Sequence, residues 1–290
     1  MNAIVVIAIG KSKIWDICRK TVIRYCKKYN IALEIISDSK YLENPFPDSP
    51  NFNMFEKNQI YSLFEKYERI LRLDWDTIIT PKCPNLFEIV PEDKIGGVIE
   101  DVGTSKVSRR KMMKILQNTL GDIGWRRDYI NAGVILVSKP HRDVIYTSEE
   151  EVEMLANLKM NIYNEQTYLN YKIRKSGFEI FPLKFKFNHT SLFSEPWNKC
   201  ANKFDSYVIH YAGKFNQFEL MLADYNYIFF NISKPLKISD ILKNNKLRFT
   251  FRQFLKMSKK ILNDKKRSFS QKKKDFFNFI KRYVNYFRYW

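Results

Sequence analysis

Apolar and polar segments alternate in a regular order at the start of the chain, and this order constrains the fold more than any other feature. Residues 3–9 are apolar without a polar break, which is typical of a strand buried on both faces of a parallel sheet. We predict helices over residues 14–29 and 55–67, and further strands over residues 31–37 and 69–73. Strand, helix, strand, helix, strand predicts an α/β domain with a largely parallel sheet.

The same kind of pattern continues and extends the predicted α/β domain over residues 1–236. Helical patterns lie at residues 106–118, 148–158 and 164–175. Strand patterns lie at residues 94–100, 129–138, 178–188 and 207–213. The expected fold class is a mostly parallel mixed sheet flanked by helices, followed by a separate helical tail over residues 237–290.

The tail carries most of the positive charge of the protein. The chain has a net charge of +19, and residues 237–290 hold 17 Lys and Arg against three Asp and Glu. In residues 276–290, eight of the fifteen side chains are aromatic and form an apolar stripe beside basic residues. A basic amphipathic helix of this kind suits an anionic membrane surface. Two alternatives are packing of the stripe on the catalytic domain and binding of nucleic acid.

The cysteines and the N-terminus bear on the cellular compartment. Cys18, Cys26, Cys83 and Cys200 have no metal-type spacing, so we expect reduced thiols in a cytosolic protein. The first apolar run is too short to span a membrane and lacks the basic region and cleavage site of a signal peptide. We expect a cytoplasmic protein that can attach peripherally to the cytoplasmic face of the membrane.

The segment RILRLDWDT ends a predicted buried strand with two aspartates, Asp74 and Asp76. In an extended chain, residues i and i+2 point to the same face, so the two carboxylates should converge while Trp75 points away and packs. Ligands of open α/β sheets bind beyond the carboxyl ends of the strands. Paired carboxylates there favour a Mg²⁺ or Mn²⁺ site shared with phosphates. The alternative is a solvated exit from the strand.

A second polar group follows the strand pattern near residue 210. His210 ends an apolar segment and precedes Gly213 and Lys214. A histidine can be the third ligand beside two carboxylates. A glycine next to a lysine lets the backbone approach a diphosphate while the ammonium neutralises it. The alternative is a buried core histidine beside a turn.

LRLDWDT is also similar to the first motif of haloacid-dehalogenase-like phosphatases, in which the two aspartates act as nucleophile and acid. That family carries the motif on its first strand, whereas here two predicted strands and two helices precede it. Its later metal motif is matched poorly by Gly121-Asp122 and Asp128. We keep this class, and a non-enzymatic nucleic-acid-binding protein, as alternative interpretations.

Four segments together resemble a known family. KNQIYSLFEKYERILRLDWDTIIT, YINAGVILVS, NEQTYLN and IHYAGK occur in the order found in GT-A-fold glycosyltransferases. They are most similar to glycosyltransferase family 8, which includes glycogenin and bacterial lipooligosaccharide galactosyltransferases. The resemblance covers residues 1–216 and implies transfer of a hexose from a nucleotide-diphosphate sugar, with UDP favoured, to a glycan or glycolipid hydroxyl.

The resemblance also implies the cofactor and the residues that bind it and the donor. By position, Asp74, Asp76 and His210 match the ligands of a divalent metal, commonly Mn²⁺, with Asp74 also near the donor. Gly213 and Lys214 match a diphosphate contact. The implied donor-binding residues are Ala8, Ile9 and Gly10 near the base and ribose, Lys57 facing the nucleotide, and Asn131, Ala132 and Gly133 along the donor sugar.

Two departures from the family pattern concern the catalytic residues. In NEQTYLN, Glu165 stands where an aspartate is usual, Gln166 is kept, and Thr167 stands where a second acid often follows. Lys214 follows Gly213 directly, without the usual Lys-Pro-Trp ending. Retention at the anomeric carbon is the outcome that we expect. An inverting reaction would need a carboxylate base facing the acceptor, for which Glu165 and Asp101 are the candidates.

Overall fold

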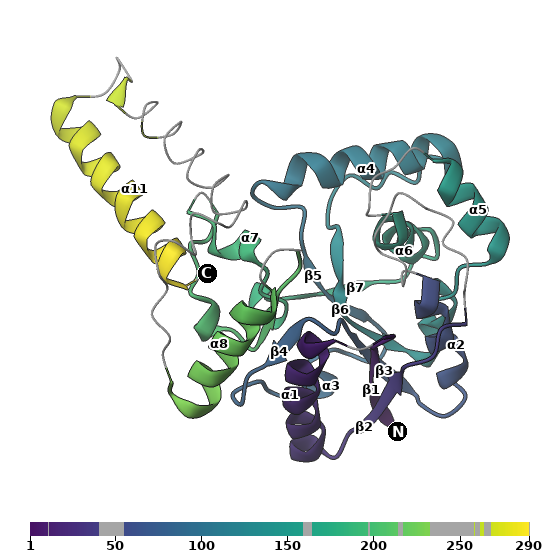
Figure 1. Cartoon of the computed structure of the whole chain (residues 1–290). Helices are drawn as coiled ribbons and strands as arrows, with labels where there is room; N and C mark the ends of the chain where they lie inside the picture. Colours follow the sequence, from purple (N-terminus) through teal and green to yellow (C-terminus); the bar gives the residue numbers. More distant parts are fainter. Residues whose placement is uncertain are drawn as a thin grey trace.

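The computed structural model describes residues 1–10, 12–40, 55–158, 164–196, 198–213, 217–232, 258, 262–263 and 268–289. Its main element is a six-stranded sheet in the order β2-β1-β3-β6-β5-β7 (Figure 1). The strands are β1 (Asn2–Ile7), β2 (Ala32–Ile36), β3 (Arg69–Leu73), β5 (Ile95–Ile99), β6 (Ile130–Ser138) and β7 (Ile180–Leu183). Only β6 runs antiparallel to its two neighbours, so the prediction of a mostly parallel mixed sheet is confirmed.

The long helices are α1 (Lys13–Tyr29), α4 (Ser105–Leu120), α6 (Asn164–Lys175), α8 (Gln217–Phe230) and α11 (Phe269–Tyr289). The shorter ones are α2 (Ile60–Leu63), α3 (Leu86–Ile89), α5 (Glu149–Asn157) and α7 (Ser191–Ser194). Helices α1, α4, α5 and α6 lie where the sequence predicts them, whereas α3, α7 and α8 were not predicted. Four 3₁₀ turns are described as well: η1 (Phe55–Gln59), η2 (Lys139–Val144), η3 (Phe185–Phe187) and η4 (Lys203–Asp205).

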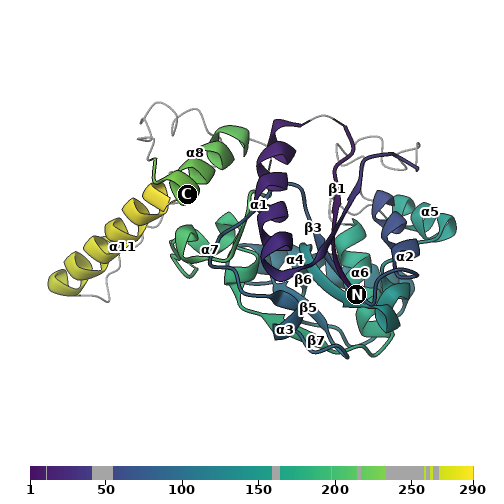
Figure 2. The same ribbon diagram turned by 90° about the horizontal axis from the view of Figure 1, so that it is seen from below.

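Alternate residues of the central strands face two different cores. Ile4, Val6 and Leu71 belong to the core that lies between the sheet and α1. Ala3, Val5 and Ile70 belong to the core on the opposite face, which α2 and α6 cover. Figure 2 shows α1 and α8 on the same side of the molecule. The unbroken apolar run of β1 is therefore explained by burial on both faces, as the sequence predicts.

Two predicted elements are shorter in the structure. The helix predicted over residues 55–67 is the 3₁₀ turn η1 followed by a single turn of α-helix. After α2, the backbone N–H of Phe64 and that of Lys66 bond carbonyls three residues earlier, so the chain tightens before β3. The strand predicted over residues 178–188 ends at Leu183. Its partner β5 pairs with it as far as Leu183, and the chain then turns into the 3₁₀ turn η3 and leaves this sheet.

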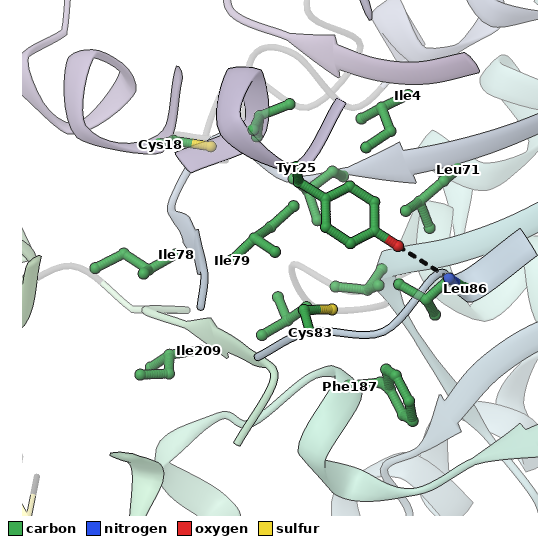
Figure 3. Packing of buried hydrophobic residues seen from close by; sticks show 14 of the residues in the cluster. Ile4, Cys18, Tyr25, Leu71, Ile78, Ile79, Cys83, Leu86, Phe187 and Ile209 are labelled. Atoms are coloured by element: carbon green, nitrogen blue, oxygen red, sulfur yellow. Dashed lines mark hydrogen bonds between the residues drawn. The ribbon is translucent and has the colours of Figure 1, made fainter. Parts of the chain in front are cut away.

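A second, two-stranded sheet lies at the carboxyl end of β3. It pairs β4 (Thr77–Ile79) with β8 (Val208–His210) in antiparallel orientation. The strand predicted over residues 207–213 is thus confirmed in its central part. Its inner side chains, such as Ile78 and Ile209, are fully buried in the α1 core (Figure 3). This small sheet joins a late segment of the chain to the end of β3.

The described part of the tail is α11, which projects on the side of α7 and α8, away from the sheet (Figure 1, Figure 2). Its Phe279 is 7% exposed and Phe277 is 59% exposed, so the two side chains face different environments. The predicted boundary at residues 236 and 237 lies outside the described residues, as do nearly all the residues of the earlier basic segment. Among the described helices, none combines the length and the apolar character needed to cross a membrane.

The side chain of Tyr25 connects α1 to the start of α3 through hydrogen bonds (Figure 3). Its hydroxyl donates to the carbonyl of Pro84 at 2.9 Å and accepts from the backbone N–H of Leu86 at 2.9 Å. The side chain is buried, so both bonds are shielded from water. Removing the hydroxyl would leave the buried backbone N–H of Leu86 without this partner, and the carbonyl of Pro84 with only the bond from Cys83 Sγ.

We therefore expect Tyr25→Phe to lower the free energy of unfolding by about 1–3 kcal/mol, because desolvated backbone groups lose their partners. Chemical denaturation followed by circular dichroism measures the change. Tyr29→Phe is the matched control, since Tyr29 is less buried and its hydroxyl makes a single bond, to the carbonyl of Cys83. Equal losses in the two variants would contradict this account.

Candidate metal centre

Two carboxylates and one imidazole converge where β3 leaves the sheet. Asp74 and Asp76 lie between β3 and β4, and His210 is the last residue of β8. Antiparallel pairing places Thr77 opposite His210, and the backbone N–H of Tyr211 donates to the carbonyl of Asp76 at 2.9 Å. The ladder between β4 and β8 therefore sets the histidine beside the aspartates.

The side-chain atoms of the three residues face one another. His210 Nε2 lies 3.2 Å from Asp76 Oδ1 and 3.8 Å from Asp74 Oδ2. One ligand atom from each residue lies within 4.8 Å of the other two. The convergence of Asp74 and Asp76 that alternation predicts is thus present, and Trp75 packs partly buried against the α1 core, as predicted. Among the described residues, this is the single group of three such side chains that could hold an ion.

Charge in and around the cluster fits a cation. Burial alone would lower the pKa of His210, but the carboxylates of Asp76 and Asp74 outweigh it and raise that pKa. Two carboxylate oxygens and one imidazole nitrogen are a donor set suited to Mn²⁺ and acceptable to Mg²⁺. Asp74, 31% exposed, leaves the cluster open on one side to a substrate. Asp74, Asp76 and His210 are therefore the residues that would hold the metal.

Behind the aspartates lies a buried thiol that is not a further ligand. Cys18 Sγ is 4.0 Å from the backbone oxygen of Asp74 and 3.6 Å from Thr77 Oγ1. Burial raises the pKa of this thiol to about 12. It therefore stays protonated at neutral pH and packs as an apolar side chain.

A cluster of ion pairs lies next to Asp74. Lys57 Nζ is 4.0 Å from Asp74 Oδ1 and 3.2 Å from Glu165 Oε2. Arg72 Nη1 contacts Glu165 Oε1 at 3.1 Å. The structure thus brings Lys57, which we expect to face the nucleotide, and Glu165, which we expect to take part in catalysis, to the metal centre.

The two cations determine the state of the acids. Burial would raise the pKa of Asp74, but Lys57 and Arg72 outweigh it, and the pKa lies below its ordinary value. The same balance lowers the pKa of Glu165. A carboxylate that is held ionised by two cations is a weak proton acceptor. Glu165 is therefore better placed to orient Lys57 and Arg72 than to act as a general base.

Arg72 is a residue of this site that the sequence analysis missed. It lies on β3 two positions before Asp74, so its side chain points to the same face of the strand. A charged residue in the middle of a fully buried strand was the available signal, although β3 also begins with an arginine, Arg69. Gln217, the first residue of α8, was missed as well: its Nε2 donates to Asp76 Oδ2 at 3.3 Å.

Gln166 faces the neighbouring strand rather than the metal centre. Its Oε1 accepts from the backbone N–H of Ala132 at 3.0 Å, and its Nε2 donates to Glu100 Oε2 at 3.1 Å. Glu100 in turn pairs with Arg109 at 3.1 Å. Gln166 thus links α6 to the segment Asn131–Gly133.

The other candidate base, Asp101, is buried and already bonded. Its Oδ1 accepts from the backbone N–H of Tyr129 at 3.0 Å, and Arg110 lies 3.6 Å from its Oδ2.

The predicted nucleotide-binding segment lies at the same edge of the sheet as the aspartates. β1 and β3 are parallel neighbours with Val6 opposite Leu73, so Ala8, Ile9 and Gly10 leave the sheet beside Asp74. Gly10 has a φ of +84°, a backbone conformation that glycine adopts without strain. Gly213 follows His210 by three residues and has a φ of +129°. Lys214 lies outside the described residues.

Gly133 lies closest to the cluster. Its carbonyl accepts from the backbone N–H of Asp74 at 2.8 Å. A Cβ at this position would lie 2.3 Å from His210 Cε1 and 2.8 Å from Asp74 Oδ2. A glycine is needed here so that the metal-binding side chains can approach β6. The side chain of Asn131 is buried, with Oδ1 accepting from the backbone N–H of Gly133 at 2.8 Å.

This arrangement, an Asp-x-Asp and a histidine at the carboxyl end of a mostly parallel sheet, is that of a GT-A-like glycosyltransferase. Residues 2–216 match the family described as glycosyl transferase family 8. The chain therefore belongs to glycosyltransferase family 8, which decides against the phosphatase alternative.

Several solved structures are similar to the chain. The glycosyltransferase involved in the glycosylation of the major capsid of PBCV-1 is 17% identical, with a TM-score of 0.47 over 76% of this chain and 98% of that chain. The bifunctional glycosyltransferase WbbM is 15% identical, with a TM-score of 0.47 over 78% of this chain and 50% of that chain. Mouse xyloside xylosyltransferase 1 is 12% identical, with a TM-score of 0.44 over 75% and 99% of the two chains. No curated protein matches the chain.

We expect Gly133→Ala to weaken metal binding by about 10–100-fold, the usual cost of displacing ligands through their surroundings. The added methyl group must push His210 or Asp74 out of place. Titration with Mn²⁺, followed by the electron paramagnetic resonance signal of the free ion, measures the affinity.

Gly97→Ala on the adjacent strand β5 is the control. Its Cβ would meet the end of the flexible Ile130 side chain at 2.9 Å, so stability should fall while metal affinity is kept. Unchanged affinity in Gly133→Ala would show that the metal is bound elsewhere.

Proposed function

We propose that this protein transfers a hexose from a nucleotide-diphosphate sugar, with UDP as the favoured nucleotide, to a hydroxyl of a glycan or glycolipid acceptor. The reaction would depend on Mn²⁺ or Mg²⁺. The observation that carries the proposal is the convergence of Asp74, Asp76 and His210 at the carboxyl edge of the sheet in a family 8 chain. Ligands of open α/β sheets bind at this edge.

In this proposal the metal, held by the three residues, supplies Lewis-acid stabilisation of the departing nucleoside diphosphate. The side chains of the chain itself orient the donor and balance charge around it. Lys57, between Asp74 and Glu165, is a cation facing the same space as the metal ligands. Lys214, four residues after His210 in the sequence, would add a second cation at the diphosphate. Ala8, Ile9 and Gly10 would line the base and ribose.

Retention of anomeric configuration is the stereochemical outcome that we propose. An inverting transferase needs a carboxylate free to take the proton of the acceptor hydroxyl. Glu165 is engaged by Lys57 and Arg72, and Asp101 is buried and engaged by the backbone of Tyr129 and by Arg110. The state of these two acids supports a reaction in which the leaving phosphate accepts the proton.

Nucleotide and metal binding should be mutually dependent. We expect UDP to stabilise the protein in the presence of Mn²⁺, by about 2.7 kcal/mol at a ligand concentration of 100 times Kd. Asp76→Asn should lose this stabilisation and the transferase activity while staying folded. A thermal-shift panel of nucleoside diphosphates with and without Mn²⁺ measures the effect.

Asp122→Asn is the matched control, because Asp122 is an exposed carboxylate paired only locally with Arg126. It should behave as the unmodified protein. Full metal-dependent stabilisation in Asp76→Asn would contradict the proposed function.

We also propose that the tail attaches the enzyme peripherally to an anionic membrane, on the cytoplasmic face, where a glycolipid acceptor would lie. The supporting features are the many aromatic residues in the sequence of residues 276–290, the exposed Phe277, and the nearby basic residues Lys272, Lys273 and Lys274. Each lysine near such a surface contributes about 1 kcal/mol of attraction. The buried Phe279 shows that one part of the helix packs within the protein.

Replacing Lys272, Lys273 and Lys274 together by glutamate should reduce sedimentation with phosphatidylserine-containing vesicles by at least about tenfold, because three attractive charges become repulsive. The control variant changes Lys106, Lys111 and Lys114, exposed on α4, in the same way and alters net charge equally. Equal loss in both variants, or no loss in either, would rule out the tail as the attachment site.

A further inference from the structure

We propose that Asn188 and Asn131 form a relay of side-chain amides that holds a proton on Nδ1 of His210. The relay leaves Nε2 as the atom that faces the cation. Asn188 and Asn131 are thus positioning residues for a metal ligand. The inference deepens the proposed function, since it rests on His210 being that ligand.

The relay begins at a backbone group that is always a hydrogen-bond donor. The N–H of Gly133 can only donate, and it bonds Oδ1 of Asn131 at 2.8 Å. The oxygen end of the Asn131 amide is therefore determined by the main chain of β6. Both asparagines are buried, Asn188 completely, so water does not compete for these bonds.

The second bond sets the orientation of Asn188. Its Nδ2 donates to the same Asn131 Oδ1 at 2.8 Å. With the nitrogen end committed to Asn131, the oxygen end of the Asn188 amide faces His210. Asn188 Oδ1 lies 2.8 Å from His210 Nδ1. An amide oxygen only accepts, so His210 Nδ1 must carry the proton of this bond.

The bond to Asn188 also determines the role of the other ring nitrogen of His210, Nε2. Nε2 faces oxygens of Asp76 and Asp74, at 3.2 and 3.8 Å, and these are also acceptors. Because Asn188 keeps the proton on Nδ1, Nε2 is the ring nitrogen whose lone pair can meet a cation placed between it and the two carboxylates. A metal-binding histidine commonly bonds an acceptor through its second nitrogen.

A second buried histidine, His189, provides an internal reference, because its hydrogen bonds predict the opposite tautomer. The hydroxyl of Ser194 donates to the carbonyl of Ala201 at 2.8 Å, so its oxygen accepts from His189 Nε2 at 2.8 Å. His189 Nδ1, 2.6 Å from the Ser206 hydroxyl, is then the acceptor. His189 should carry its proton on Nε2. Burial lowers the pKa of His189 to about 3, so this ring stays neutral.

Nuclear magnetic resonance of protein labelled with ¹⁵N in the histidine rings tests the proton positions directly, and the chain has only three histidines. We expect Nδ1 of His210 to be protonated both without metal and with Mg²⁺, and the Nε2 signal to be the one that shifts when the metal is added. His189 should show the opposite tautomer throughout. A His210 ring that is unprotonated at Nδ1 in the metal-free protein would overturn the proposal.

Variants test the relay itself. Asn188→Leu removes the acceptor at similar volume and should weaken Mn²⁺ binding by about 10–100-fold. Asn131→Ala removes the acceptor that fixes the orientation of the Asn188 amide. The amide can then rotate by half a turn, and Mn²⁺ binding should weaken as well. The two losses should not add in the double variant, because both substitutions break one chain of bonds. Asn188→Asp keeps an acceptor for Nδ1 and should bind Mn²⁺ more tightly than Asn188→Leu.

Gln117→Met is the matched control. Gln117 is a buried amide on α4 that bonds the backbone of Trp125, away from the metal centre, so its loss should cost stability without changing Mn²⁺ affinity. Affinity within twofold of the unmodified protein in Asn188→Leu would overturn the relay. Failure to transfer sugar, with the expected proton positions observed, would instead count against the proposed function.

Discussion

Repulsion between the carboxylates of Asp74 and Asp76 is the constraint to which the rest of the site responds. Two like charges at the partly buried end of a strand are costly unless positive groups approach them. Here the compensation comes from three directions: Lys57 in η1, Arg72 within β3, and His210 across the small sheet. Glu165 adds a third carboxylate, so these acids outnumber the two permanent cations. That imbalance is the electrostatic basis for a divalent metal at this position.

The small two-stranded sheet of β4 and β8 positions the histidine of the metal centre. Three paired residues on each strand carry His210 to the aspartates from more than 130 positions away in the chain, and bury Ile78 and Ile209 beneath them. Side chains that are packed on an apolar layer lose little further freedom when a ligand binds. The close approach of Gly133 from β6 then completes a centre built from three separate strands.

Hydrogen bonds between buried polar groups connect the metal ligands to the surrounding structure. Asn188, Asn131 and the backbone of Gly133 lie on one side of His210, and Gln217 from α8 reaches Asp76 on the other. α8 is itself held by Asp224, which bonds the buried Lys203 at 2.6 Å and the Tyr211 hydroxyl at 2.5 Å. Polar groups in such networks must all find partners because the low-dielectric interior penalises any that do not. The helix that precedes the tail is therefore tied directly to the site.

By itself, the sequence determined the order of the six strands of the main sheet and of the helices between them up to α6, except α3, together with the mostly parallel sheet, the family, and the convergence of Asp74 and Asp76. These features follow from local periodicity and from motifs that lie within short segments. Helix length after residue 55 and the end of β7 were predicted wrongly, because pairing partners and tight turns decided them. Only the tertiary structure brought Arg72 and Lys57 to Glu165, turned Gln166 toward Ala132, and placed Asn188 against His210. Those contacts join residues 22 to 108 positions apart, and Asn131 lies 57 positions from Asn188. Hydrogen bonds across such separations depend on how the layers pack, and residue spacing along the chain carries no signal for them.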